Sequence, residues 1–292
     1  MTAERSLPGV SPRLRARLRL LFRVLTWISP PLAARVAMSM LLTPLAHRPG
    51  ADDDAFHATA RQRRLRTPYG GVQAYEWSGS GPTVLIVHGW ISHSGRFASL
   101  IDALRRRGFR VIAFDAPAHG RSGGRRADLV AFRTAIETTA AELGPVHAVV
   151  AHSFGALSTA SWLSATPLAT LKGAVLIGLM RDLGYLLDSF VTMLQLRPDV
   201  AARLRALLVR RYGAEPEQFS ARALAAHIRV PVLIVHGEED ELVPSAHAGE
   251  IAEQLIDGRV VIVPGQHHSQ PLRDATTIGI MTEFLLRHTA AA

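Results

Sequence analysis

The sequence predicts an α/β fold in which a mostly parallel central sheet is flanked by helices. Short apolar runs rich in Val and Ile recur along the chain, and longer segments with helical spacing separate them. The runs are continuous rather than alternating, which indicates strands buried on both faces, as in parallel sheets. They lie at residues 83–87, 110–114, 148–151, 174–177, 232–235 and 260–263. Residues 72–77 are expected to add an antiparallel strand.

The composition indicates one globular domain with an extension and excludes several kinds of site. The chain has 292 residues, 48% of them hydrophobic, which is enough for one large core. It carries 33 Lys and Arg against 24 Asp and Glu, and Lys172 is its only lysine. The arginines are scattered and no basic stripe is interleaved with aromatic residues, so we expect no nucleic-acid partner. The absence of cysteine excludes disulfides, thiolate metal sites and a cysteine nucleophile.

The N-terminal region reads as a helical hairpin. Between Pro12 and Ile28 the apolar residues recur at helical spacing while most arginines project elsewhere, and a second helical stretch spans residues 31–42. One interpretation lays the first helix on a membrane surface, with Phe22 and Trp27 in the interface. The alternative packs both helices on the main domain or on a partner subunit, the commoner fate of such helices.

Arginines and two consecutive prolines interrupt the apolar N-terminal region. A spanning helix needs about 18 uninterrupted apolar residues, so no single-pass anchor is expected here. The predicted location is the cytoplasm, with peripheral attachment through the basic amphipathic helix as the alternative.

The domain division follows from where the pattern changes. We expect residues 1–66 to form the helical extension and, at its end, a polar connecting segment, and residues 67–292 to form the main domain. Within residues 179–226 the alternation stops, and Leu, Met and Phe occupy more than one helical face. This stretch is longer than a single crossover and predicts an inserted helical cap.

A candidate nucleophile lies at the end of the run at 148–151. Ala151-His152-Ser153-Phe154-Gly155 leads from a buried strand into a helical run, with a small residue two positions before and two after the serine. A strained strand-to-helix turn requires small residues there and presents the hydroxyl at a helix N-terminus. The alternative is that this serine only caps a helix. The preceding strand favours Ser153 as the nucleophile.

A second strand ends in His88-Gly89-Trp90. Its loop could point backbone N–H groups at the oxygen of a substrate held by Ser153. We expect the N–H groups of Trp90 and Phe154 to form an oxyanion hole. His88 itself is better explained as a structural histidine bound to loop carbonyls.

An acidic turn and a pair of histidines follow the last two strands. Residues 238–241 are Glu-Glu-Asp-Glu, and one of these carboxylates could orient an imidazole. His267 and His268 lie in the loop after the run at 260–263, where either could act as a base. Taken singly, the acids could cap a helix and the histidines could be inert. The order serine, acid, histidine, each directly after a strand, favours a catalytic triad.

Five segments together resemble the successive signatures of the α/β-hydrolase superfamily, over roughly residues 70–290. They are His88-Gly89-Trp90, Asp115-Ala116-Pro117-Ala118-His119-Gly120-Arg121-Ser122, Ala151-His152-Ser153-Phe154-Gly155, Gly237-Glu238-Glu239-Asp240-Glu241-Leu242-Val243-Pro244 and Gly265-Gln266-His267-His268. The resemblance implies an α/β-hydrolase fold and selects Asp240 as the acid and His268, rather than His267, as the base. The chain departs from the family at Ala151, where many members have glycine, and in its N-terminal helices, which the minimal fold lacks.

The reaction that this resemblance implies is acyl transfer from an ester through an acyl-enzyme on Ser153, with no metal or organic cofactor. An apolar substrate is expected because the predicted cap carries Leu186, Leu187, Phe190, Met193 and Leu194, which could line a pocket or form the cap's own core. An acyltransferase or a thioesterase would carry the same triad. A binding protein that keeps the fold without catalysis is the alternative from another class.

Overall fold

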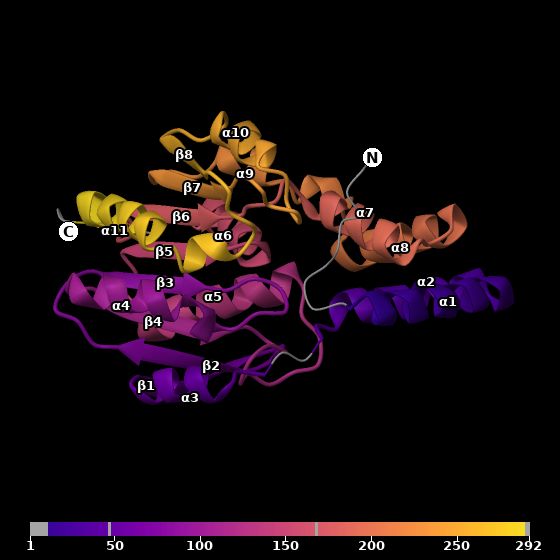
Figure 1. The fold of residues 1–292 in the computed structure, drawn as a ribbon, viewed down its shortest axis with the longest axis horizontal. Coiled ribbons are helices and arrows are strands. Elements are labelled where there is room, and N and C mark those ends of the chain that lie inside the picture. The colour runs from indigo at the N-terminus through magenta and orange to yellow at the C-terminus, as the bar shows by residue number, and fades with distance from the viewer. Residues whose placement is uncertain (1–10, 46–47, 167–168, 290–292) are drawn as a thin grey trace.

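A single eight-stranded sheet runs through the molecule, in the order β1-β2-β4-β3-β5-β6-β7-β8 (Figure 1). The computed structural model describes residues 11–45, 48–166 and 169–289; residues 1–10 and 46–47 of the predicted extension lie outside the described residues. The strands are β1 (Arg61–Thr67), β2 (Gly70–Trp77), β3 (Thr83–Val87), β4 (Arg110–Asp115), β5 (Ala148–His152), β6 (Gly173–Ile177), β7 (Val232–Gly237) and β8 (Gly258–Val263). β2 pairs antiparallel with β1 and β4, and all pairs from β4 to β8 are parallel. The predicted α/β class with a mostly parallel sheet is confirmed.

Helices cover both faces of this sheet. The α-helices are α1 (Pro12–Ile28), α2 (Pro30–Leu42), α3 (Ala51–Ala58), α4 (Ala98–Arg106), α5 (Leu129–Leu143), α6 (Phe154–Ala165), α7 (Leu183–Leu194), α8 (Pro198–Tyr212), α9 (Ala221–Ala225), α10 (Ala246–Ala252) and α11 (Ala275–Thr289). Successive side chains of a strand point to opposite faces, so Val84 and Ile86 of β3 pack under α4 and α11. Leu85 and Val87 belong to the opposite core, with α5, α6, α9 and α10. Both faces of the central strands are therefore dry, as their continuous apolar runs predicted.

A third core lies outside the sheet, between the N-terminal hairpin and two later helices. α2 packs along α8, and α1 contacts α7. Phe22 and three alanines of α2 are buried against Phe190, Leu194 and Leu204. The four helices lie together beside the sheet (Figure 1). The inner face of the hairpin therefore packs on the chain's own helices, the second of the two arrangements expected from the sequence.

Two stretches differ from the irregular or inserted structure expected from the sequence. In the segment predicted to be a connection, the described residues form α3 and the edge strand β1. β1 is rich in arginine, and only Leu65 is buried, because an edge strand keeps one side in solvent. At the end of the predicted cap, α9 packs on α6 and α10, in the main core. In that range α7 and α8 stand away from the sheet, and the short 3₁₀ turn Pro216–Gln218 packs on both of them.

Specific polar contacts tie the four outer helices to the sheet domain. Arg211 of α8 bonds through Nε to Asp128 Oδ2 at 2.9 Å, while Asp128 Oδ1 caps α5 by accepting the Ala131 N–H at 2.8 Å. The carbonyl of Leu42, at the end of α2, accepts the Ala127 N–H at 2.9 Å. The Asp128 region therefore holds both the hairpin and α8. Among the described residues, none of the helices combines the length and apolar character needed to cross a membrane.

We predict that Arg211→Met destabilises the protein by about 1–3 kcal/mol, because it leaves one oxygen of the buried Asp128 carboxylate without its charged partner. Urea unfolding followed by circular dichroism measures the loss. Arg197→Met is the matched control, since Arg197 pairs with Asp199 on an exposed surface and should change stability little. Equal stability of the Arg211 variant and the wild type would show that this ion pair does not hold α8.

Candidate active site

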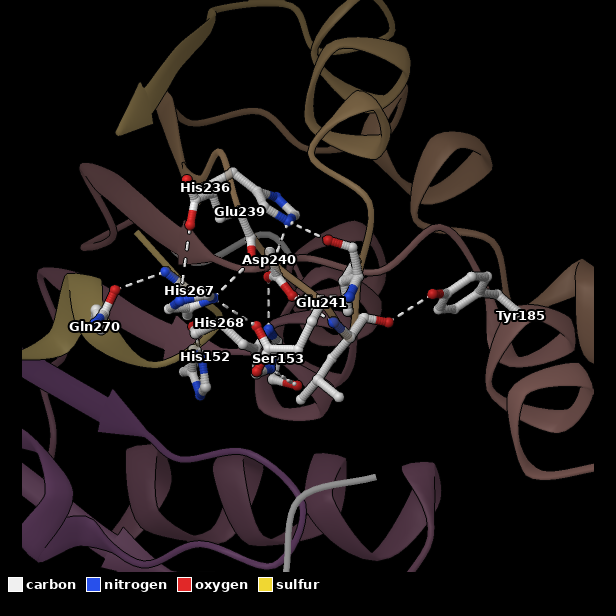
Figure 2. Close-up of polar contacts among 12 residues, drawn as sticks. His152, Ser153, Tyr185, His236, Glu239, Asp240, Glu241, His267, His268 and Gln270 are labelled. Atoms are coloured by element: carbon white, nitrogen blue, oxygen red, sulfur yellow. Dashed lines mark hydrogen bonds and ion pairs between the residues drawn. The ribbon is translucent and has the colours of Figure 1, made fainter. Parts of the chain in front are cut away.

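The carboxyl ends of three parallel strands bring together the three predicted triad residues. Ser153 follows β5, Asp240 lies in the turn after β7, and His268 lies in the loop after β8. Parallel strands end at the same sheet edge, so side chains distant in sequence converge there. His268 Nε2 lies 2.9 Å from Ser153 Oγ, and His268 Nδ1 lies 2.6 Å from Asp240 Oδ2. Figure 2 shows the resulting chain of hydrogen bonds from hydroxyl to imidazole to carboxylate.

Ser153 occupies a strained turn between β5 and α6. Its φ of 55° and ψ of −123° lie outside the regions that L-residues normally adopt, at a cost of about 1–3 kcal/mol. A Cβ added at Gly155 would lie 2.1 Å from the carbonyl oxygen of His88, so the small residue after the serine is needed for this close approach. The turn lifts the hydroxyl above the sheet at the N-terminus of α6, where partial positive charge favours an anion.

The carboxylate of Asp240 accepts hydrogen bonds on both oxygens. Oδ1 accepts the backbone N–H groups of Leu242 and Val243, at 2.9 and 2.8 Å. Oδ2 faces His268 and also His236 Nε2, at 3.1 Å. Burial opposes ionisation of Asp240, but the hydrogen bonds from His236 and His268 outweigh it, and the pKa of Asp240 is held below its ordinary value. Asp240 is therefore a carboxylate across the neutral pH range.

The hydrogen bonds fix the tautomer of His268. Because a carboxylate only accepts hydrogen bonds, Nδ1 carries the proton and donates a hydrogen bond to Asp240. The lone pair of Nε2 then points at the Ser153 hydroxyl, the arrangement that a general base requires. His268 is 7% exposed, and its backbone carbonyl accepts the Nε2–H of His152 at 3.0 Å. The buried neighbour of the serine therefore holds the histidine loop in place.

His236 is a hydrogen-bond partner of Asp240 that the sequence analysis did not identify. It is the next-to-last residue of β7, is fully buried, and donates its Nε2–H to the carbonyl of Val243 at 2.9 Å as well as toward Asp240. The signal in the sequence was a histidine at a buried strand end four residues before the acid. By contrast, His267 is exposed beside Glu239 and Glu241.

The loop after β3 lies against the nucleophile. A Cβ at Gly89 would approach Ser153 Cβ to 3.0 Å, so the backbone of the His88-Gly89-Trp90 segment passes directly beside the serine. His88 accepts the Ala116 N–H on Nε2 at 2.8 Å and therefore donates from Nδ1 to the Gly89 carbonyl at 2.7 Å. The structural role expected of His88 fits these two bonds.

A largely apolar cavity of about 370 Å³ lies beside Trp90 and Phe154. Three parts of the chain line it: the hairpin with the residues that follow it, the loops at the sheet edge, and α7 with α8. Of the five apolar residues expected at a pocket or a cap core, four line the cavity: Leu186, Leu187, Phe190 and Met193. Leu194 is buried in the core between the helices. The hairpin contributes Leu14 and Leu18 to the same wall.

Comparison with known proteins identifies the family. A model of the serine aminopeptidase S33 family matches residues 80–221, and one described as TAP-like protein matches residues 211–290. The chain belongs to the α/β-hydrolase superfamily. Among its relatives, a non-heme haloperoxidase of Rhodococcus erythropolis is 26% identical over 70% of this chain and 91% of its own. A monoacylglycerol lipase of Mycolicibacterium smegmatis is 27% identical, over 63% of this chain and 80% of its own.

The solved structure of mouse alpha/beta hydrolase domain-containing protein 10 shares the fold. Its TM-score is 0.59 at 17% identity, covering 77% of this chain and 97% of that one. Neither family model includes the N-terminal hairpin, since the matched ranges begin at residue 80. The family match therefore says nothing about the role of the hairpin, which has to be inferred from the sequence and structure of this chain.

The stability of this hydrolase should fall in mild acid. Burial lowers the pKa of His88, His119 and His152 to about 3 each, against 6.5 for an exposed histidine. Between these values the unfolded chain binds a proton at each site that the folded chain does not. The free energy of unfolding should therefore drop by about 1.4 kcal/mol per pH unit per histidine as pH falls below 6.5.

Urea unfolding at pH 7 and pH 5 measures this loss, in a window above the titration of exposed carboxylates. His119→Gln removes one of these groups and should flatten the slope by about 1.4 kcal/mol per pH unit. Equal stability at the two pH values would mean that these histidines are protonated in the folded protein.

Proposed function

We propose that this α/β-hydrolase cleaves carboxylic esters with an apolar acyl group, with Ser153 as nucleophile, His268 as base and Asp240 as the orienting acid. The observation that carries the proposal is the unbroken hydrogen-bonded chain from Ser153 Oγ to Asp240 Oδ2, beside an apolar cavity. The name of the Mycolicibacterium smegmatis relative, monoacylglycerol lipase, supports an ester as the substrate.

The reaction proceeds in two acyl-transfer steps. His268 Nε2 takes the proton of Ser153 Oγ as the oxygen attacks the ester carbonyl, and the protonated imidazole then gives that proton to the departing alcohol. Water, deprotonated by the same nitrogen, attacks the acyl carbonyl, and the imidazolium returns the proton to Ser153 Oγ as the acyl–oxygen bond breaks and the acid is released. Asp240 stabilises the imidazolium that forms in each step, and its bonds to Leu242, Val243 and His236 keep it charged.

The oxyanion hole is proposed to consist of the Trp90 and Phe154 N–H groups. Phe154 is the first residue of α6, so its N–H has no partner within the helix. Trp90 directly follows Gly89, whose backbone adjoins Ser153. Both residues also line the cavity, so a carbonyl at this position would have its acyl chain in apolar surroundings.

We further propose a functional division of the chain. The range 179–226 supplies the helical cap through α7 and α8, and the extension in residues 1–66 supplies a second cap layer through α1 and α2. The contacts of α1 with α7 and of α2 with α8, and the shared third core, support this division. The cavity lies where the two layers meet the sheet edge, so acyl-chain length should depend on both.

The triad is tested by labelling with a fluorophosphonate probe and by hydrolysis of p-nitrophenyl esters. Ser153→Ala should abolish labelling, and Asp240→Asn should lower kcat by about 10⁴-fold while the geometry is kept, because the wrong tautomer of His268 is favoured. His267→Ala is the matched control and should retain wild-type rates. A folded Ser153→Ala protein that still reacts with the probe would disprove the assignment. A folded wild type that neither labels nor turns over would favour a binding protein that keeps the fold, and addition of alcohol or thiol acceptors would reveal a transferase.

The hairpin's contribution to the pocket is tested with Leu18→Trp. The larger side chain takes up cavity volume, so kcat/KM for long-chain p-nitrophenyl esters should fall by about tenfold while that for the acetate changes little. Val24→Trp, on the exposed outer face of the same helix, is the control and should keep the wild-type chain-length profile. An unchanged profile in Leu18→Trp would place the acyl chain elsewhere.

A further inference from the structure

The outer face of the α1–α2 hairpin is apolar at its tip although it faces solvent. Trp27 is 86% exposed, Ile28 and Leu20 are each 62% exposed, and Val24 is 49% exposed. These four residues lie on one side of α1, at helical spacing. Leu32, at the start of α2, adds a further 44% exposed side chain next to the tip. Such a contiguous exposed apolar surface on one element marks an interaction site.

The charge of the same hairpin is entirely positive. The sequence from residue 5 to residue 51 contains no Asp or Glu, and α1 and α2 carry six arginines. Arg13, Arg17, Arg23 and Arg35 are exposed. Arg13 and Arg17 share the outer face of α1 with the apolar residues but lie nearer its N-terminus. The outer face is therefore basic in its first half and apolar toward the tip.

The hairpin projects from the molecule tip first. The start of α1 and the end of α2 lie on the side of the sheet, and the turn that joins the two helices lies at the far end (Figure 1). With a rise of 1.5 Å per residue, Arg17 lies about 15 Å behind Trp27 along the helix axis. If the outer face lies against a bilayer, the apolar side chains near the tip would enter the acyl boundary and the arginines nearer the start of α1 would meet lipid phosphates.

We propose that this outer face docks on an anionic lipid bilayer, with Leu20, Val24, Trp27, Ile28 and Leu32 in the interface and the exposed arginines on phosphate groups. The absence of acidic residues from the hairpin favours this occupant over a second copy of the chain, because a symmetric contact would set arginines against arginines. Docking of this kind gives the two faces of the hairpin different environments: the outer face contacts lipid, and the inner face contacts the third core and the cavity.

Docking would place the cavity next to a source of acyl chains. Leu14 and Leu18 line the cavity from the same helix whose outer face meets the membrane, so a lipid ester would enter beside the hairpin rather than from water. This second step rests on the proposed ester hydrolysis. The docking itself does not depend on it.

The test is co-sedimentation of the full chain with two kinds of vesicle. One is phosphatidylcholine alone, and the other mixes phosphatidylcholine and phosphatidylglycerol at a molar ratio of about 2:1. Binding should be strong to the anionic vesicles only and should weaken with salt. Arg13→Gln with Arg17→Gln should lower the partition coefficient by about 25-fold, from about fivefold per arginine. Arg222→Gln with Arg259→Gln removes the same charge from exposed positions elsewhere and should leave binding unchanged.

The apolar contribution is tested with Leu20→Gln, Trp27→Gln and Ile28→Gln combined, which should reduce binding by about tenfold or more. The matched control replaces Ile256, Val260 and Ile262, which are 63%, 37% and 40% exposed at the β8 edge, with glutamine. The hairpin variant and the control variant should both keep wild-type hydrolysis of p-nitrophenyl acetate, which would show that both proteins fold.

Two outcomes would overturn the docking proposal. One is equal binding of the hairpin variants and the wild type, or no binding of the wild type to anionic vesicles. The other is a wild-type dimer, found by analytical ultracentrifugation, that the hairpin substitutions convert to monomers without any effect of lipid. Because sedimentation needs no turnover, loss of the ester-hydrolysis proposal would leave this result interpretable.

Discussion

The buried carboxylate of Asp240 is the charge around which the candidate site at this edge of the sheet is organised. A buried carboxylate is costly unless its oxygens accept hydrogen bonds, and this one faces two backbone N–H groups and two histidines. Those donors come from the turn that carries the acid, from the end of β7 and from the loop after β8. Satisfying one charge therefore fixes the relative positions of three segments, and the position of His268 beside Ser153 follows from it.

The same turn also connects the candidate site to the outer helices. Tyr185 of α7 donates its hydroxyl proton to the carbonyl of Leu242 at 2.5 Å, two residues beyond the acid. Arg211 of α8 reaches Asp128, which caps α5 and lines the cavity. A shift of α7 or α8 would therefore change the positions of the turn that carries Asp240 and of the cavity wall together. α7 and α8, the proposed cap, are thus mechanically coupled to the candidate site rather than a separate cover.

The sequence predicted the sheet well because the central strands β3 to β7 are buried and read as continuous apolar runs, and the more exposed edge strand β8 also contains such a run. The motif residues were also accessible to sequence reasoning, since Ser153, Asp240 and His268 each directly follow such a run. β1 was missed because an edge strand with four arginines has no apolar run to detect. His236 was missed because a histidine at the end of a strand has no pattern of its own, and its role depends on a carboxylate that the turn folds back against it.

The fate of the N-terminal helices could not be decided from their pattern, because an amphipathic helix buries its apolar stripe equally well on protein or on lipid. The structure shows why both readings had support. Phe22 packs inward against α7 and α8, whereas Trp27, five residues further along the helix, is almost fully exposed. A helix with apolar residues on two sides would ordinarily be a solubility liability, and its arginines offset that only in part. The proposed docking would give the second side an apolar environment too, so that the inner face of the hairpin lines the cavity while its outer face would contact lipid.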